Sequence, residues 1–415
     1  MDITIKGGTL SGTVSSTASK SAAHRALICA ALADRPTEIY ICSKNEDIGA
    51  TINCLRAMEA SITENENSLA VTPIAAFPEK AEFDCGESGS TLRFLLPVAA
   101  ALLPQSEFSG RGNLPNRPIG ELVSVLEKNG AEISGNRLPM TVNGKLHAGT
   151  FEIAGDVSSQ YISGLLMALP LLEGDSAIIL TSPLCSKPYV SLTIDMLSKF
   201  RIEIGSAGSG YSVRGGQSFR SPDTLSIEGD WSAAALFLAA GAVCGDVTVN
   251  GLNTDSVQGD RAIVDLLRFF GAEADISESS ARLHKAKLKA CSVDASAIPD
   301  LFPILAVLAA CAEGRTVLYN AAHLRYKESD RLKSTAAMIN SLGGKAEEFS
   351  DRLEITGKPL SGGCVDSFGD HRIVMAAAVA ACACKGETVI HGAEAVNKSY
   401  PGFFRDFSAL GGKVL

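Results

Sequence analysis

Residues 229–244 read GDWSAAALFLAAGAVC, in which a glycine and an aspartate precede an almost wholly apolar run. Aspartate is favoured directly before a helix because its carboxylate accepts hydrogen bonds from the free N–H groups of the first turn. A helix that is apolar on every side has to be buried on every side. The segment therefore predicts a buried helix that begins beside Asp230.

The same pattern of a polar cluster before an apolar run recurs along the whole chain. Its successive markers lie 69, 69, 71, 70 and 70 residues apart, so six units nearly fill the 415 residues. A regular period indicates a repeated structural unit. We expect each unit to hold a buried helix that begins at a Ser or Asp cap, surrounding strands such as 247–249, and an outer helix. The markers are Ser21, Ser90, Ser159, Asp230, Asp300 and Asp370.

Composition and charge exclude several classes of protein. The net charge of −9 gives no general attraction to nucleic acid or to an anionic membrane. The apolar runs reach about a dozen residues, fewer than the roughly 20 that a membrane span needs, and residues 1–6 read as a strand. The 11 cysteines have no metal-ligand spacing and are typical of small core residues in a reducing compartment. We therefore expect a cytoplasmic protein without a metal site.

The polar clusters would lie at the N-terminal ends of the buried helices. Free N–H groups and the helix dipole favour anions there. One such cluster alone is typical of an ordinary helix cap, but six in register, several with added cations, favour a shared anion site. In the densest cluster, 325–331, a helix would place Lys327 and Arg331 on one face. A solvated helix start with local ion pairs explains that segment equally well.

Taken together, the motifs resemble the 5-enolpyruvylshikimate-3-phosphate synthase family over essentially the whole chain. Any one motif could arise by chance, but their order and joint presence are specific. They are Ser19-Lys20-Ser21 with Arg25, the segment 86–93, Asn116-Arg117-Pro118-Ile119-Gly120, Ser158-Ser159-Gln160, Ser186-Lys187-Pro188-Tyr189, Gln258-Gly259-Asp260, Pro299-Asp300, Lys327-Glu328-Ser329-Asp330-Arg331, Asp370-His371-Arg372 and Lys398.

The resemblance implies an α/β (α+β) fold of the inside-out barrel type. It implies two similar domains, each with three repeated units of buried parallel helices and surrounding sheets. Residues 1–17 and 229–415 would form the first domain and residues 18–228 the second, with the active site in the cleft between them. The implied reaction transfers the enolpyruvyl group of phosphoenolpyruvate to the 5-hydroxyl of shikimate 3-phosphate by addition and elimination, in the shikimate pathway to chorismate and the aromatic amino acids.

The resemblance further implies that no cofactor takes part, that glyphosate is an inhibitor, and that neither nucleic acid nor membrane is a partner. We expect a monomer. By resemblance, Asp300 is the base, and Glu328 is the acid, helped by Lys20. Shikimate 3-phosphate would be bound by Lys20, Ser21, Arg25, Ser158, Ser159, Gln160, Ser186, Tyr189, Asp300, His323 and Lys327. Phosphoenolpyruvate would be bound by Lys20, Gly89, Arg117, Gln160, Arg331, Arg372 and Lys398.

Two alternatives share this fold. A transferase acting on UDP-N-acetylglucosamine typically has Lys-Asn where this chain has Lys20-Ser21, and it has a loop cysteine that is missing from 115–117. A non-catalytic anion-binding scaffold would explain the caps, but not the presence of both Asp300 and Glu328 among the cations. The chain also departs from the family pattern. It has Thr17-Ala18-Ser19 where many members have Pro-Gly-Ser, and Glu87 and Ser90 where some members have Asn and Thr.

Overall fold

The computed structural model describes residues 1–415, and the contacts between Cα atoms divide the chain into two compact units. Unit 1 comprises Met1–Thr17 and Glu228–Leu415, and unit 2 comprises Ala18–Ile227. The boundary expected after residue 228 therefore lies one residue earlier. Glu228 belongs with unit 1 because its carboxylate accepts hydrogen bonds from the side chains of Asn253, Ser256 and Gln258.

Unit 2 contains three buried helices, each followed in the chain by a more amphipathic helix. The buried helices are α1 (Lys20–Ala31), α3 (Gly89–Leu102) and α5 (Ser159–Ala168), and the others are α2 (Glu46–Ala57), α4 (Gly120–Lys128) and α6 (Lys187–Lys199). Three sheets cover them. In spatial order their strands are β14 (Thr224–Ser226), β3 (Thr37–Tyr40), β5 (Ser68–Thr72) and β4 (Ser61–Glu64); β6 (Lys80–Asp84), β7 (Gln105–Ser109), β9 (Met140–Asn143) and β8 (Glu132–Ile133); and β10 (Thr150–Ile153), β11 (Ser176–Leu180), β13 (Gly210–Val213) and β12 (Ile204–Ala207).

Unit 1 repeats this plan. Its buried helices are α7 (Trp231–Cys244), α9 (Phe302–Cys311) and α11 (His371–Cys382), and its outer helices are α8 (Ile263–Phe269), α10 (Arg331–Ser341) and α12 (Phe403–Ala409). In spatial order its strands are β16 (Ala274–Ile276), β17 (Ser280–His284), β15 (Asp246–Asn250) and β2 (Ser11–Ser15); β18 (Ser292–Asp294), β19 (Arg315–Tyr319), β21 (Leu353–Thr356) and β20 (Lys345–Glu348); and β22 (Gly363–Asp366), β23 (Glu387–His391), β1 (Asp2–Lys6) and β24 (Lys413–Val414).

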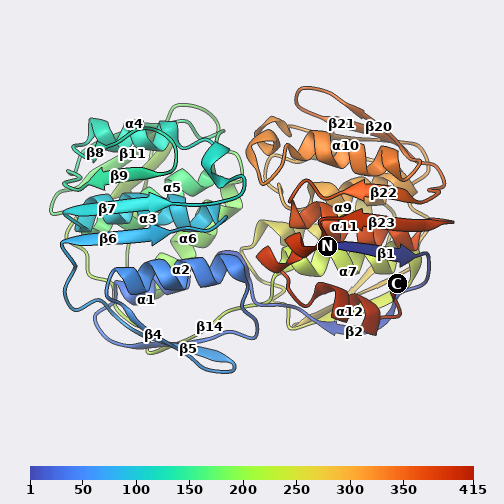
Figure 1. Ribbon diagram of the computed structural model, residues 1–415, viewed down its shortest axis with the longest axis horizontal. Helices are drawn as coiled ribbons and strands as arrows, with labels where there is room; N and C mark the ends of the chain where they lie inside the picture. The colour runs from blue at the N-terminus through green and yellow to red at the C-terminus, as the bar shows by residue number, and fades with distance from the viewer. The chain divides into compact units, whose positions relative to one another are not determined.

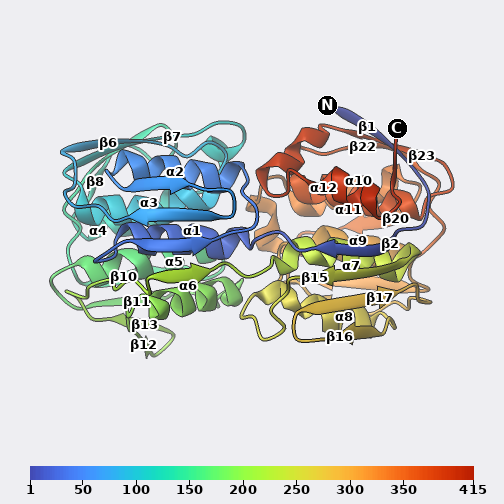
Figure 2. The same ribbon diagram turned by 90° about the horizontal axis from the view of Figure 1, so that it is seen from below.

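The sixfold repeat is confirmed by the sheets. Each of the six has four strands, with one parallel pair at one edge followed by two antiparallel pairs. In unit 1 the first residues of the chain complete two of these sheets. Strand β1, drawn in blue, lies beside the red β23 (Figure 1), and β2 runs parallel to β15 (Figure 2).

The apolar runs form buried helices, as their sequence predicts. Every residue of α7 and of α11 is buried. The helices α7 and α11 run in the same direction. Cys244 and Cys382, which interact with each other, lie at their C-terminal ends, and Asp230 and Asp370 cap their N-terminal ends. None of the helices in the structure combines the length and the apolar character needed to cross a bilayer.

The expected N-caps need correction in the first half of the chain and at Asp300. Ser19, Ser88 and Ser158 accept the first-turn N–H bonds of α1, α3 and α5, so the marker serines Ser21, Ser90 and Ser159 lie inside those helices. Asp230 and Asp370 cap as expected. Asp300 does not cap α9, because two arginines bind its carboxylate and Leu301 occupies the cap position.

A chain of buried polar side chains joins three helices of unit 2. Nδ1 of His24 lies 2.7 Å from Oγ1 of Thr51, which lies 2.7 Å from Oγ1 of Thr91, and Thr91 donates to Ser88 at 2.8 Å. The other ring nitrogen of His24, Nε2, is buried without a hydrogen-bond partner. Burial lowers the pKa of His24 from 6.5 to about 3. The imidazole is therefore neutral at neutral pH.

This histidine makes unit 2 sensitive to acid. Between pH 6.5 and about 3, His24 is protonated in the unfolded chain but neutral in the folded protein. The free energy of unfolding therefore falls as the pH falls through this range. We expect a loss of about 2 kcal/mol between pH 6.5 and 5, measured by hydrogen exchange of the α1 amides. His24→Gln should flatten this slope, whereas the exposed His147→Gln should not. An unchanged slope in His24→Gln would contradict the assignment.

Candidate functional site

The densest group of charges in unit 1 surrounds Arg331, the first residue of α10. Its side chain is only 1% exposed and contacts three carboxylates. Nη1 donates to Asp300 at 2.6 Å, Nη2 to Glu328 at 2.8 Å, and Nε to Asp370 at 2.9 Å. Although burial alone would lower the pKa of Arg331, the three carboxylates raise it well above its usual value. Arg331 is therefore a permanent cation that holds the acids of this cluster together.

Asp300 bridges two guanidinium groups. Its Oδ1 accepts from Arg331 and its Oδ2 accepts from Nη2 of Arg372 at 3.1 Å, while 22% of its side chain stays exposed. Burial acts to raise the pKa of Asp300, but Arg372 and Arg331 outweigh it and hold this pKa well below its usual range. In the free protein Asp300 is thus an ionised carboxylate, accessible to a ligand but stabilised against accepting a proton.

The segment that precedes α10 differs from the sequence prediction. Lys327 and Glu328 lie in the connection between a 3-10 helix, η4 (Ala322–Tyr326), and α10, so Lys327 and Arg331 do not share a helix face. The helix starts late because Asp330 caps it, accepting from the N–H of Lys333. The connection brings Glu328 onto Arg331, with its side chain 13% exposed.

The remaining predicted residues of unit 1 are His323 and Lys398. His323 lies in η4 and is buried. Lys398 ends the 3-10 helix η5 (Ala393–Lys398) and is also buried.

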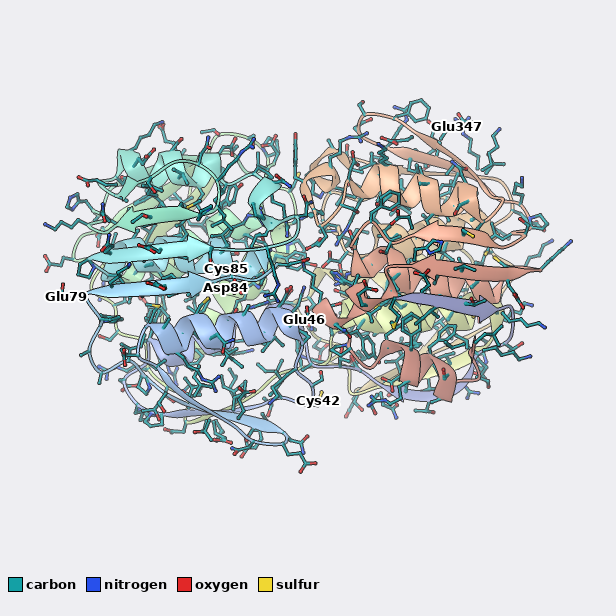
Figure 3. The ribbon with its side chains drawn as sticks, viewed as in Figure 1. Cys42, Glu46, Glu79, Asp84, Cys85 and Glu347 are labelled. Carbon is teal, nitrogen blue, oxygen red and sulfur yellow. The ribbon has the colours of Figure 1, made fainter.

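In unit 2 the first cation of the predicted site is anchored by an acid. Nζ of Lys20, at the start of α1, lies 2.7 Å from Oδ2 of Asp47. Asp47 also lines a cavity of about 230 Å³ together with Glu46, Asp84 and Arg111. Figure 3 shows Glu46 at the start of α2 and Asp84 at the end of β6. The position of Lys20 is therefore set by α2 as well as by its own helix.

The N-terminal ends of α3 and α5 are joined by a bridge of polar side chains. Nη1 of Arg93 donates to Oε1 of Gln160 at 2.8 Å, and Nε2 of Gln160 donates to Ser90 at 2.9 Å. Nη2 of Arg93 donates to the carbonyl of Pro118, next to Arg117. This bridge fixes the amide of Gln160, so the orientation of one predicted ligand depends on Arg93.

Gly89 permits two guanidinium groups to approach the start of α3. A Cβ atom at this position would lie 2.6 Å from Nη1 of Arg93 and 2.7 Å from Nη1 of Arg117. Real Cβ atoms are not found so close to other atoms, and both guanidinium groups would have to shift. A side chain at this position would therefore displace the cations beside it.

Arg25 is a buried organising residue. Its guanidinium donates to the carbonyls of Ser21 and Tyr189 and to the hydroxyl of Thr193, and it lies over the ring of Phe94. Burial lowers the pKa of Arg25 to about 10, so it stays charged at neutral pH. Arg25 thereby ties α1 to the first turn of α6.

Ser186, just before α6, adopts a left-handed conformation with φ of 54°. A non-glycine residue in this conformation is uncommon, and such strain is often found at functional sites. Of the neighbouring predicted residues, Ser158 caps α5 by accepting from the N–H of Gln160, and Ser159 is buried in its first turn.

Three residues around the site were not predicted as ligands, although two of them, Arg93 and Asp370, lie within motifs that the sequence analysis identified. Arg93, Asp47 and the carboxylate of Asp370 all contact predicted residues directly. The position of Arg93 four residues after Gly89 places both on one helix face, which was a usable signal. Asp47 lies 27 residues from Lys20, and no sequence pattern links the two.

Comparison with known proteins is consistent along the whole chain. The model of the EPSP synthase (3-phosphoshikimate 1-carboxyvinyltransferase) family matches residues 5–407. A 3-phosphoshikimate 1-carboxyvinyltransferase of Clostridium kluyveri is 43% identical over 417 residues, covering 99% of this chain and 98% of the relative. One of Clostridium acetobutylicum is 42% identical, covering 98% and 96%.

Solved structures have the same fold. An EPSP synthase of Acinetobacter baumannii superposes with a TM-score of 0.82 at 26% identity, covering 100% of this chain and 99% of the other. The enolpyruvyl transferase NikO of Streptomyces tendae superposes with a TM-score of 0.80 at 19% identity, covering 100% and 98%, and at that identity the likeness concerns the fold alone.

Proposed function

The chain belongs to the EPSP synthase (3-phosphoshikimate 1-carboxyvinyltransferase) family, and from this we propose how its side chains divide the work of binding and catalysis. The chain is a transferase of the shikimate pathway. It moves the enolpyruvyl group of phosphoenolpyruvate to the 5-hydroxyl of shikimate 3-phosphate and releases phosphate. The observation that carries the residue assignments is the Asp300 carboxylate, which is held by two buried arginines beside a second carboxylate, Glu328.

The assigned cations bind the acidic groups of the substrates. Phosphoenolpyruvate carries a carboxylate and a phosphate, and guanidinium groups bind both with paired hydrogen bonds. We assign this substrate to Lys20, Gly89, Arg117, Gln160, Arg331, Arg372 and Lys398. We assign shikimate 3-phosphate to Lys20, Ser21, Arg25, Ser158, Ser159, Gln160, Ser186, Tyr189, Asp300, His323 and Lys327.

Asp300 takes the proton from the 5-hydroxyl as the oxygen attacks C2 of phosphoenolpyruvate. Glu328, with Lys20, delivers a proton to the methylene carbon. The methyl group later returns a proton as the C–O bond to phosphate breaks. Asp300 is a weak base while both arginines bind it. The anionic substrate competes for the same guanidinium groups, which weakens their hold on the carboxylate and raises its basicity.

The assignment of substrates is tested by phosphate release. We expect release from phosphoenolpyruvate only when shikimate 3-phosphate is present, and none when UDP-N-acetylglucosamine replaces it. Release with UDP-N-acetylglucosamine, or release that needs no acceptor, would refute it. We also propose that the chain acts as a cytoplasmic monomer, for which light scattering should give a mass near 43.3 kDa.

Gly89→Ala should weaken the binding of phosphoenolpyruvate. The added methyl group lies within 3 Å of both Arg93 and Arg117. It therefore displaces Arg117, which we place at this substrate, and Arg93, which orients the ligand Gln160. We expect KM for phosphoenolpyruvate to rise about tenfold or more, which corresponds to about 1.4 kcal/mol, with little change in KM for shikimate 3-phosphate. Gly49→Ala is a matched control, because a Cβ atom on that helical glycine meets nothing within 4 Å. Equal KM values in the two variants would contradict the role of Gly89.

A further inference from the structure

Asp260 is a buried carboxyl group to which the reaction assigns no role. It lies in the 3-10 helix η3 (Gly259–Ala262), and its residue is 2% exposed. Ser232, in the first turn of α7, donates a short hydrogen bond to its Oδ2. Its Oδ1 is buried and has no hydrogen-bond partner. A fully ionised carboxylate in such a place would keep one charged oxygen buried without a hydrogen bond, which is unfavourable.

The charges around Asp260 come from the ends of all three buried helices of unit 1. Asp300 precedes α9, Arg372 lies in the first turn of α11, and Asp230 caps α7; each of them interacts electrostatically with Asp260. Arg372 interacts with the same three acids. Arg372 is thus the cation shared by Asp260 and the catalytic carboxylate Asp300.

Two carboxyl groups that share one cation do not titrate alike. Burial, and then the charge of Asp300, raise the pKa of Asp260 from 3.8 to about 7. The pKa of Asp300 moves in the opposite direction, because Asp300 also contacts Arg331. When Asp260 and Asp300 together bind one proton, the proton is therefore on Asp260, whose ionised form is less stabilised by arginine than that of Asp300.

We propose that Asp260 is a positioning residue that stores one proton and is a neutral acid whenever an anionic substrate occupies Arg372. This proposal rests on the assignment of phosphoenolpyruvate to Arg372 made above. The arriving anion brings negative charge next to both carboxyl groups, and one of them must take up a proton from solvent. Because Asp260 takes it, Asp300 remains ionised and available as the base. Asp260 returns the proton to solvent when phosphate leaves.

The proposal predicts a specific pH dependence. Above pH 7, Asp260 is ionised in the protein without substrate. Binding of phosphoenolpyruvate then requires Asp260 to take up a proton, so the affinity for phosphoenolpyruvate falls as the pH rises. Asp260→Asn imitates the neutral acid and removes this requirement. We expect the ratio of KM for phosphoenolpyruvate, wild type over Asp260→Asn, to rise about tenfold between pH 7 and 8.5. Taking the ratio cancels the ionisation of the substrate itself.

Calorimetry gives a second readout. Titration of phosphoenolpyruvate into the protein without shikimate 3-phosphate, in two buffers of different ionisation enthalpy at pH 8, measures the protons taken up on binding without turnover. We expect uptake by the wild type and by the control Asp265→Asn, which changes an exposed acid on α8, and reduced uptake by Asp260→Asn. A merely structural Asp260 would lower stability and activity by the same factor at every pH.

If Asp260→Asn does not fold, the variant Ser232→Ala tests the same proposal. Ser232 lowers the pKa of Asp260 through its hydrogen bond, so its removal should move the loss of affinity to higher pH. An unchanged pH profile in both variants, or equal proton uptake by wild type and Asp260→Asn, would overturn the proposal. Absence of any turnover by the wild type would instead refute the proposed function, so the two failures are distinguishable.

Discussion

An Asp300→Asn variant should lose about two to four orders of magnitude in kcat, the range typical for removal of a general base. Asparagine keeps the shape of the side chain and one oxygen acceptor, but it cannot take the 5-hydroxyl proton. Its neutral amide also releases Arg331 and Arg372 from a competing anion. We therefore expect KM for phosphoenolpyruvate to fall while kcat collapses, which a general loss of structure would not produce.

Phosphate release at saturating shikimate 3-phosphate measures both constants. Glu328→Gln should lose kcat on a similar scale, because its amide donates no proton to the methylene carbon. Asp265→Asn serves as the control, since it removes an exposed acid of the same unit and should keep the wild-type rate. Turnover within a few-fold of wild type in both Asp300→Asn and Glu328→Gln would exclude them as base and acid.

Arg331→Met should destabilise unit 1 by about 3–5 kcal/mol, the usual effect of removing one partner from a buried ion pair. The change leaves Asp300, Glu328 and Asp370 without the cation that they share. The only tryptophan of the chain, Trp231, is fully buried in unit 1. Its fluorescence in a urea titration therefore follows the unit that carries the mutation.

A second substitution separates the effect of the uncompensated carboxylates from the effect of lost packing. Adding Asp370→Asn to Arg331→Met removes one uncompensated charge and should restore part of the lost stability. The control Arg268→Met breaks an exposed pair on α8 and should change the unfolding free energy by less than about 0.5 kcal/mol. If Arg331→Met unfolds at the wild-type urea concentration, the three carboxylates do not depend on this arginine.

The plan of the fold could be predicted from the sequence because it depends on local patterns. An apolar run behind a serine or aspartate forms a buried helix, and six such runs at a constant spacing indicate six similar units. The exact caps were less predictable. Serines cluster at each start, as in Ser19-Lys20-Ser21, and only the backbone decides which hydroxyl receives the N–H bond.

The sequence identifies which charged residues belong to the site, but it does not indicate which of them contact each other. The sequence indicates that Arg331 and Asp300 belong to one site, but not that they bind each other, because their contact depends on how α10 packs against α9. The prediction that Lys327 shares a helix face with Arg331 was wrong, because Asp330 caps the helix and excludes Lys327 from it. Asp260 lay within a quoted motif, yet its burial and its missing partner are visible only in three dimensions.

The two N-terminal strands have a consequence for how the chain is made. Strand β1 pairs with β23 and β24, and β2 pairs with β15, so both must await residues synthesised much later. Unit 2 is continuous from Ala18 to Ile227, and all strands of its sheets lie within that segment. During synthesis on the ribosome, unit 2 is therefore complete while residues 1–17 still lack the strands with which they pair. Strands β23 and β24 emerge last and complete the sheet that contains β1.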